Sequence, residues 1–241
     1  MCSSDLKIPT SMGLLFIIVQ TFTVGLIGFI QKEKLLDLFY LPILYLVGLI
    51  FIALVGLFDD LVGDKNVKGF KGHISSFFKG RLTSGGLKAG VGLLVSLFIS
   101  IYISNGVLEI VINTLIISLF TNLLNLFDLR PGRAGKVYIL ISIVLLLTSN
   151  MKELDFIMYS LFGILAIYLP MDLKAKAMMG DIGSNLLGLS LGVYCAITHG
   201  LIAKIIYLIL LICIQIVSEF ISFSSIIENN KFLRYIDNLG R

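Results

Sequence analysis

The sequence predicts an all-α integral membrane protein: a polytopic helical bundle with about eight transmembrane helices and a functional site at its cytoplasmic face. Hydrophobic residues make up 57% of the 241-residue chain, charged residues only 14%, and the mean hydropathy is +1.00. Soluble globular domains carry roughly 25% charged residues, so this composition excludes that class. The apolar runs are continuous rather than alternating, which excludes the strands of a membrane β-barrel.

Eight apolar segments approach the roughly 20 residues that a helix needs to cross the hydrocarbon core. The second segment ends at the acidic pair Asp59 and Asp60, and the fourth ends at Asp128. The fifth and seventh segments are short, so we expect the ends of these two helices to be the hardest to place. The predicted spans cover, in chain order, residues 13–30, 39–57, 87–104, 107–127, 137–149, 154–170, 186–198 and 201–223.

The basic residues predict the orientation, because lysine and arginine concentrate in cytoplasmic loops. With the N-terminus inside, all of the 19 basic residues lie on the inner side except Lys32, Lys34, Lys152 and Lys204. The acidic residues that border the apolar segments then face the cytoplasm as well. We therefore expect a multi-pass protein of the cytoplasmic membrane.

No linker, repeat or low-complexity tract divides the chain, so residues 1–241 are predicted to form one transmembrane domain. The spacing of Cys2, Cys195 and Cys213 is typical of neither a disulfide framework nor a metal site. Residues 224–241 form a tail in which apolar side chains follow an approximate helical stripe. The tail either lies flat in the membrane interface or is a frayed polar end, and the sequence favours neither.

Carboxylates at the ends of membrane spans are candidates for function, because ionisable groups at membrane depth are costly to place. Asp59, Asp60, Asp128 and Asp181 each border an apolar segment on the same predicted side. Mg²⁺ prefers such oxygen ligands and is usually held by one or two carboxylates together with substrate phosphates. Each aspartate alone is more often a solvated boundary residue, so it is their shared side that indicates a common pocket.

Polar neighbours of these aspartates predict the walls of the pocket. Asn122, Asn125 and Asp128 are spaced three apart and are expected to share one helix face. An asparagine in a span is also often an interhelical hydrogen-bond partner. Further along the chain, Ser184 or Asn185 is expected to cap a helix whose free N–H groups would favour an anion.

Basic residues near the same face predict an anionic ligand. Arg130 and Arg133 flank a Pro-Gly pair that ends the fourth span, which places two guanidinium groups beside the pocket. The longest inner loop, from Asp59 to about Gly86, is rich in glycine and lysine and leads to Lys88. Such a loop suits phosphate, although basic inner loops also bind lipid headgroups.

Four motifs occur in order: Lys7-Ile-Pro-Thr-Ser-Met-Gly13, Gly56-Leu-Phe-Asp-Asp60, Asn122-Leu-Leu-Asn-Leu-Phe-Asp128 and Met179-Gly-Asp-Ile-Gly-Ser184. Together they resemble the polyprenyl-phosphate N-acetylhexosamine-1-phosphate transferases, the family that includes phospho-N-acetylmuramoyl-pentapeptide transferase. The resemblance implies transfer of N-acetylhexosamine 1-phosphate to a polyprenyl phosphate such as undecaprenyl phosphate, with release of UMP, for synthesis of a cell-envelope glycan. It implies a UDP-GlcNAc or UDP-MurNAc-peptide type of donor and a Mg²⁺ cofactor, with Mn²⁺ as an alternative.

The resemblance and the local chemistry assign roles to the matching residues. Asp59, Asp60 and Asp128 are expected to be catalytic, and Asp181 and Asp60 to bind the metal. Attack of one phosphate on a diphosphate brings anions together, so a metal ion and basic side chains must offset their repulsion. The residues expected to bind substrate are Lys88, Asn122, Asn125, Arg130, Arg133, Gly183 and Ser184.

The chain departs from the family pattern in two places. Where the family commonly continues Asp-Gly-Leu-Asp-Gly, this chain has Asp128-Leu-Arg-Pro131-Gly, so Pro131 replaces the second carboxylate. The family's late histidine-rich loop has no counterpart, because the two histidines are His73 and His199, the second on the outer side. These departures favour, as an alternative, a non-catalytic relative that acts as a membrane regulator or partner.

A small-solute transporter is a weaker alternative, because the sequence shows neither inverted repeats nor mid-membrane charges. The predicted partners are the polyprenyl phosphate lipid, the UDP-sugar donor and the membrane itself. No nucleic-acid polymer is predicted as a partner, and a homodimer stays open.

Overall fold

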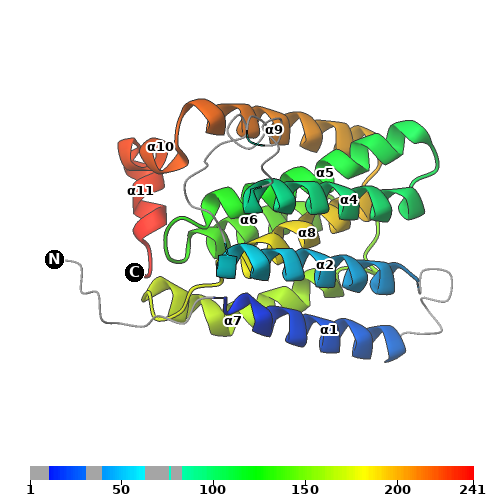
Figure 1. Ribbon diagram of the computed structural model, residues 1–241, viewed down its shortest axis with the longest axis horizontal. Helices are drawn as coiled ribbons and strands as arrows, with labels where there is room; N and C mark the ends of the chain where they lie inside the picture. Colours follow the sequence, from blue (N-terminus) through cyan, green and yellow to red (C-terminus); the bar gives the residue numbers. More distant parts are fainter. Residues whose placement is uncertain (1–10, 31–39, 63–75, 77–82) are drawn as a thin grey trace.

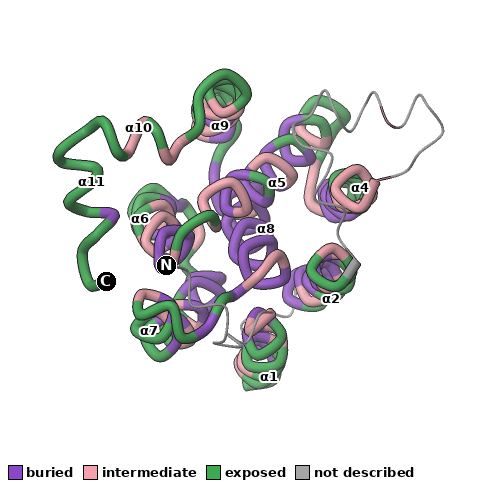
Figure 2. Tube along the Cα trace, turned by 60° about the vertical axis from the view of Figure 1, so that its left-hand side comes forward, coloured by how far each residue is buried: buried purple, intermediate pink, exposed green. Residues whose placement is uncertain are grey.

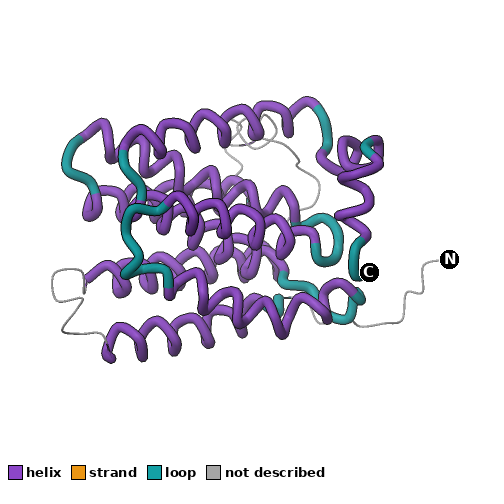
Figure 3. Tube along the Cα trace, turned by 180° about the vertical axis from the view of Figure 1, so that it is seen from behind, coloured by secondary structure: helices purple, strands orange, loops and turns teal. Residues whose placement is uncertain are grey.

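The computed structural model describes residues 11–30, 40–62, 76 and 83–241. The described residues are helical and contain no strand (Figure 3). Long helices lie side by side in one bundle (Figure 1). They are α1 (Gly13–Ile30), α2 (Tyr40–Val62), α4 (Ser84–Ile103), α5 (Val107–Phe127), α6 (Arg133–Thr148), α7 (Phe156–Leu173), α8 (Gly180–Thr198) and α9 (Leu201–Phe220). The end of the bundle at which α2 ends and α8 begins is called the site end below.

The predicted all-α, polytopic membrane fold is confirmed. Each of the eight predicted spans corresponds to one of these helices. Within the described residues, six helices have the length and hydropathy to cross a membrane, namely α1, α2, α4, α5, α7 and α9. The other two, α6 and α8, match the fifth and seventh predicted segments, which the sequence marks as short. Helix α8 begins at Gly180, earlier than the predicted start at Leu186.

Helix α8 forms the centre of the bundle (Figure 2) and is buried along almost its whole length. It packs most extensively against α5 and α2. A Cβ added at Gly188 would lie 2.5 Å from the Phe120 carbonyl oxygen, and one at Gly192 would lie 2.5 Å from the Ile117 Cα. Small residues let membrane helices approach closely. These two glycines therefore set the distance between α8 and α5.

An uncharged hydrogen-bond network joins α1, α2, α7 and α8 inside the bundle. Gln20 donates through Nε2 to the Tyr45 hydroxyl (3.1 Å) and to the Ile157 carbonyl oxygen (3.2 Å). The Ser160 hydroxyl donates to Gln20 Oε1 (2.7 Å), and the hydroxyls of Tyr45 and Ser190 lie 2.7 Å apart. Polar groups inside a membrane protein need partners within the protein. The network therefore fixes how these four helices are rotated against each other.

The end opposite the site carries its own buried polar contacts. Lys204 Nζ lies 2.7 Å from Glu109 Oε1, and the lysine side chain is only 3% exposed. His199 follows the last turn of α8, where its Nε2 lies 3.0 Å from the Thr148 hydroxyl. His199 therefore lies away from the site end, as its place in the sequence predicts.

The tail folds into two short helices at the site end, α10 (Phe223–Asn229) and α11 (Lys231–Asn238) (Figure 1). Asn230 caps α11, because its side-chain oxygen accepts hydrogen bonds from the Phe232 and Leu233 N–H groups at 3.0 and 3.1 Å. The predicted alternative of a frayed end is wrong, since local capping and the contacts described next hold the tail in a defined fold.

An ion pair and two backbone contacts hold α11 against the turn between α5 and α6. Arg133 donates through Nε and Nη2 to the two oxygens of Asp237 at 2.8 and 3.0 Å. Lys136 Nζ donates to the Asp237 carbonyl oxygen (2.7 Å), and Arg241 Nε donates to the Pro131 carbonyl oxygen (2.9 Å). The hydrogen bonds from Arg133 lower the pKa of Asp237 to about 2.

Replacing Asp237 by asparagine is expected to release the tail. The side chains of Arg133 and Asp237 are 3% and 5% exposed, and removing one partner of a buried ion pair costs roughly 3–5 kcal/mol. Amide hydrogen exchange of residues 231–241 should rise in Asp237→Asn. The control is Glu228→Gln, because Glu228 and its partner Arg130 are 50% and 41% exposed and such a pair contributes at most about 1 kcal/mol. Equal exchange in both variants would show that the ion pair of Arg133 and Asp237 does not hold the tail in place.

Candidate active site

A lysine joins the carboxylates of two helices at the site end. Lys88, near the start of α4, places Nζ 2.9 Å from Asp59 Oδ2 at the end of α2. The same nitrogen lies 2.7 Å from Asp181 Oδ2 in the first turn of α8. The three side chains are 14–25% exposed, so the cluster is sheltered but still open to a ligand. Three predicted site residues from distant parts of the sequence therefore meet.

Asn125, on the last turn of α5, completes this cluster. With its amide nitrogen 2.6 Å from Asp181 Oδ1, its amide oxygen accepts from Lys88 Nζ at 3.3 Å. The Ser184 hydroxyl lies 3.3 Å from the Asn125 side chain and donates to the Gly180 carbonyl oxygen at 3.2 Å. Ser184 is fully buried. It therefore supports Asn125 from behind and does not itself face a ligand.

Asp60 has a different position from its neighbour Asp59. Its Oδ1 accepts from the backbone N–H of Asp181 (3.0 Å), and its Oδ2 accepts from the Ser11 hydroxyl (2.8 Å). Gly180 has a φ of +67°, and a Cβ there would lie 2.5 Å from Asp60 Oδ2. The turn before α8 therefore requires glycine. Asp60 caps the start of α8 from outside that helix and so holds Asp181 in place.

The predicted cap at Ser184 or Asn185 is wrong, because both residues lie inside α8. The helix begins earlier, at Gly180, and the N–H of Asp181 is bonded to Asp60. Sequence reasoning missed this arrangement because the capping carboxylate comes from another helix rather than from the preceding residue.

The carboxylates of Asp59 and Asp181 lie in contact around the same ammonium group, 2.9 and 2.7 Å from Lys88 Nζ. Carboxylates this close repel unless a proton or a cation lies between them, and Lys88 supplies only one positive charge. The part of the chain that the structure describes has no group of three or more His, Cys, Asp or Glu arranged to hold a metal ion alone. Mg²⁺ commonly uses one or two carboxylates and substrate phosphates. The two carboxylates therefore fit a divalent cation shared with a phosphate ligand.

Asp128 follows the last residue of α5 and extends the negative charge of the site. Burial, followed by repulsion from Asp172, Asp181 and Asp60, raises the pKa of Asp128 to about 7, while Lys88 acts in the opposite direction. Such a concentration of carboxylates around one lysine favours binding of cations.

Two residues without a predicted role lie near Asp128. Asp172 is 3% exposed and accepts a hydrogen bond from the Gly132 N–H, yet its Oδ2 has no partner among the described residues. The buried Tyr168 hydroxyl also lacks a partner there. Buried polar atoms without partners indicate a place for water, an ion or a ligand group. Asp172 ends an apolar run in the same way as Asp60, so the same sequence rule could have found it.

The raised pKa of Asp128 predicts that stability falls as pH rises. An unfolded aspartate loses its proton near pH 3.9, whereas the folded protein keeps this proton to about pH 7. The folded state therefore binds more protons across this interval, and raising the pH from about 4 to about 7 favours unfolding. Melting temperatures measured across this range without divalent cations should fall less steeply in Asp128→Asn. Equal slopes would contradict the raised pKa.

Three predicted substrate-binding residues do not join the cluster. Asn122 is exposed on α5, and no hydrogen bond connects it with other described residues. Arg130 pairs with Glu228, and Arg133 pairs with Asp237. Both guanidinium groups therefore hold the tail, which sequence reasoning missed because the tail's acidic residues had no assigned partner.

Gly183 lies in a backbone contact between α1 and α8. A Cβ added at Gly13 would lie 2.2 Å from the Gly183 nitrogen. Gly183 is buried, so its position indicates close helix packing rather than direct contact with a substrate. Two predicted elements, residues 7–10 and most of the basic loop at 63–75 and 77–82, lie outside the described residues.

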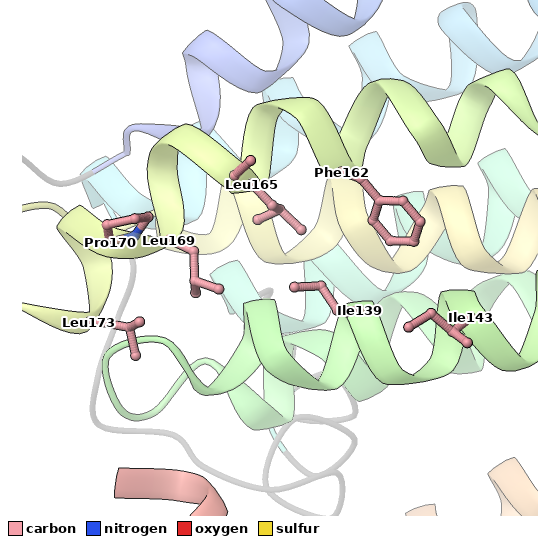
Figure 4. Close-up of a pocket in the computed structure, with 8 residues that line it drawn as sticks. Ile139, Ile143, Phe162, Leu165, Leu169, Pro170 and Leu173 are labelled. Atoms are coloured by element: carbon pink, nitrogen blue, oxygen red, sulfur yellow. The ribbon is translucent and has the colours of Figure 1, made fainter. Parts of the chain in front are cut away.

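An apolar groove of about 370 Å³ runs between α6 and α7 (Figure 4). Ile139 and Phe162 line it within the bundle, and Leu169 and Leu173 line it towards the site end. Leu173 is the neighbour of Asp172 in sequence. The groove is therefore lined by apolar side chains along α6 and α7 as far as the last residue of α7.

Comparison with known families accounts for the order in which the site residues occur along the chain. The sequence profile of glycosyl transferase family 4 matches residues 42–199, about two thirds of the chain. The chain belongs to glycosyl transferase family 4. This is the family of phospho-N-acetylmuramoyl-pentapeptide transferase and related polyprenyl-phosphate hexosamine-1-phosphate transferases, so the predicted resemblance is confirmed.

The part that matches glycosyl transferase family 4 reaches from α2 to the end of α8. It includes the whole cluster around Lys88, together with Asn125 and Asp128. The match does not extend over α9 or the tail that carries Glu228 and Asp237. A search of curated proteins found no relative that matches the chain. Family membership supports a transferase acting at a membrane and leaves its substrates to be inferred.

Proposed function

We propose that this protein transfers N-acetylhexosamine 1-phosphate from a UDP-sugar to a polyprenyl phosphate in the membrane, releasing UMP. An oxygen of the lipid phosphate attacks the phosphorus that carries the sugar. The bond from this phosphorus to the bridging oxygen breaks, and UMP leaves with the electron pair of that bond. The product is a lipid diphosphate that bears the sugar, of the type used to build a cell-envelope glycan.

The observation that carries this proposal is Lys88 held between Asp59 and Asp181 at the site end. Attack of one phosphate on another concentrates negative charge, and a fixed ammonium group stabilises that charge because the site has already oriented it. Asn125 fixes the lysine from one side and the Asp181 carboxylate from the other. Asp60 holds the backbone at the start of α8, where Asp181 lies. The attacking phosphate is already ionised, so the reaction needs no strong base to remove a proton.

A divalent cation fits this site on the evidence of the two carboxylates in contact. Asp59 and Asp181 would hold Mg²⁺, or Mn²⁺ in its place, together with oxygens of the diphosphate. When bound, the cation would neutralise charge on the leaving UMP. The groove between α6 and α7 supports a lipid acceptor, because it leads from an apolar lining to Leu173 beside Asp172.

The basic residues support a site on the cytoplasmic face of the cytoplasmic membrane, where UDP-sugars are available. The sequence places the lysines and arginines around the site end on the inner side, with only four lysines outside. The helical tail is folded at the site end as well, so the tail and the site lie on the same side of the membrane.

A second candidate is a non-catalytic relative. One observation favours it: Arg130 and Arg133 hold the tail and so leave two fewer cations for a nucleotide. Pro131 also stands where the family commonly has a second carboxylate. A transporter is less supported, because the network around Gln20 inside the bundle is uncharged.

The test is release of UMP by the full chain in lipid nanodiscs. The reaction contains Mg²⁺, undecaprenyl phosphate and either UDP-GlcNAc or a UDP-MurNAc-peptide. We expect UMP release that requires lipid and metal and is lost in Asp181→Asn. The control Asp155→Asn changes a carboxylate that accepts a hydrogen bond from Tyr194, far from the site, and should keep its activity. Absence of release with every donor, from folded protein, would support the non-catalytic relative.

A further inference from the structure

Helix α11 runs across the direction of the membrane spans. Figure 1 shows the spans lying parallel to each other and α11 crossing that direction at the site end. Figure 2 shows the tail beside α6, at the edge of the bundle rather than over its centre. A helix in this position is parallel to the membrane plane and lies over the surrounding lipid.

The height of α11 is fixed by the residues that it contacts. Asp237 bonds to Arg133, the first residue of α6. A Cβ added at Gly240 would lie 3.1 Å from Leu173 Cδ1, at the last residue of α7. Both contacts lie where spans end, so α11 is at the level of the boundary between headgroups and acyl chains.

One face of α11 is apolar and exposed. At 100° per residue, the side chains of Phe232, Tyr235, Ile236 and Leu239 project to one side of the helix. Phe232 and Tyr235 are 69% and 67% exposed, and Leu239 is 56% exposed. Asp237 projects to the other side, towards Arg133. The helix therefore binds the protein through its polar face and leaves its apolar face uncovered.

Basic residues accompany this apolar face. Lys231 and Arg234 are exposed; at 100° per residue Lys231 flanks the apolar face, whereas Arg234 projects to the opposite side of the helix. Helices that lie in the membrane interface combine an aromatic and aliphatic face with such basic side chains. A basic residue near an anionic surface is attracted to it.

We propose that α11 is an interfacial anchor: its apolar face inserts between the lipid headgroups at the site end, while Lys231 at the flank of that face contacts anionic headgroups. The helix then binds lipid on one side and the turn between α5 and α6 on the other. This proposal does not depend on the transferase reaction, since its test measures the position of a side chain and no turnover.

The chain contains no tryptophan, so a single introduced tryptophan reports its own surroundings. The full chain carrying Tyr235→Trp is placed in vesicles of phosphatidylcholine and phosphatidylglycerol with brominated acyl chains, which quench tryptophan at short range. We expect emission shifted to shorter wavelength and strong quenching. The matched control is Arg234→Trp, an exposed position on the side of the helix opposite the apolar face, which should emit at longer wavelength with little quenching.

A second pair of measurements tests the charge and the alternative occupant. Replacing phosphatidylglycerol by phosphatidylcholine should weaken the quenching of Tyr235→Trp, because Lys231 then has no anionic headgroup to contact. Water-like emission from Tyr235→Trp in both lipids would overturn the proposal. A shift in emission that depends on protein concentration, without quenching by brominated lipid, would also overturn it, because it would show a second copy of the chain on this face.

Discussion

Replacing Lys88 by methionine is expected to lower kcat for UMP release by at least about 10²-fold, the loss typical of removing one preorganised group that stabilises developing charge. The substitution removes the cation that touches both Asp59 and Asp181 and leaves two carboxylates in mutual contact. The measurement is kcat of the full chain in nanodiscs with saturating donor and acceptor.

The matched control is Lys204→Met. Lys204 is also buried and lies 2.7 Å from its own carboxylate partner, Glu109, but at the opposite end of the bundle. It is expected to lose stability while its kcat is unchanged. A folded Lys88→Met protein that kept the wild-type kcat would show that this cluster is not the catalytic centre.

The substitution with the largest expected effect on folding is Gly188→Ala. The added Cβ would lie 2.5 Å from two atoms of the α5 backbone, the Phe120 carbonyl oxygen and the Thr121 Cα. Backbone cannot rotate away as a flexible side chain does, so α5 and α8 must separate. Overpacking typically costs 1–3 kcal/mol, and we expect a loss of about 3 kcal/mol or more. Thermal unfolding in detergent measures it.

Gly163→Ala is the matched control for this change. Gly163 lies on α7 and has no atom within 4 Å of an added Cβ. Glycine inside a helix is less stable than alanine by roughly 0.5–1 kcal/mol, so this variant should unfold at the same or a higher temperature. Equal melting temperatures for the two variants would show that the contact between α8 and α5 is not a tight backbone contact.

The sequence predicts most of the fold because continuous apolar segments leave a membrane helix few alternatives. The exceptions have a clear cause. Helix α8 starts before its apolar run begins, because Ile182 to Asn185 are buried by neighbouring helices rather than by lipid. Hydropathy identifies helices whose side chains face lipid. A helix enclosed by protein can carry small and polar residues along its first turns, so hydropathy places its start too late.

The sequence predicts which residues form the site better than it predicts what each of them does. The cluster of Asp59, Lys88, Asn125 and Asp181 could be predicted because each residue lies in or near a motif at the same end of a span. What could not be predicted is how Asp60 differs from Asp59, since adjacent residues on a helix point in directions 100° apart. The pairing of Arg133 with Asp237 could not be predicted either, because it depends on how the tail folds back.

The central position of α8 has a consequence for how the protein is made. During synthesis, the ribosome produces α1 to α7 before it reaches the helix around which they pack. Until Ser190 and Gly188 emerge, the Tyr45 hydroxyl lacks one of its two partners and α5 lacks the surface on which it rests. The early spans can therefore insert, but they cannot adopt their final arrangement. Assembly around α8 and completion of the site are therefore expected to be late, and a chain that stops before residue 180 would have neither Asp181 nor the central helix.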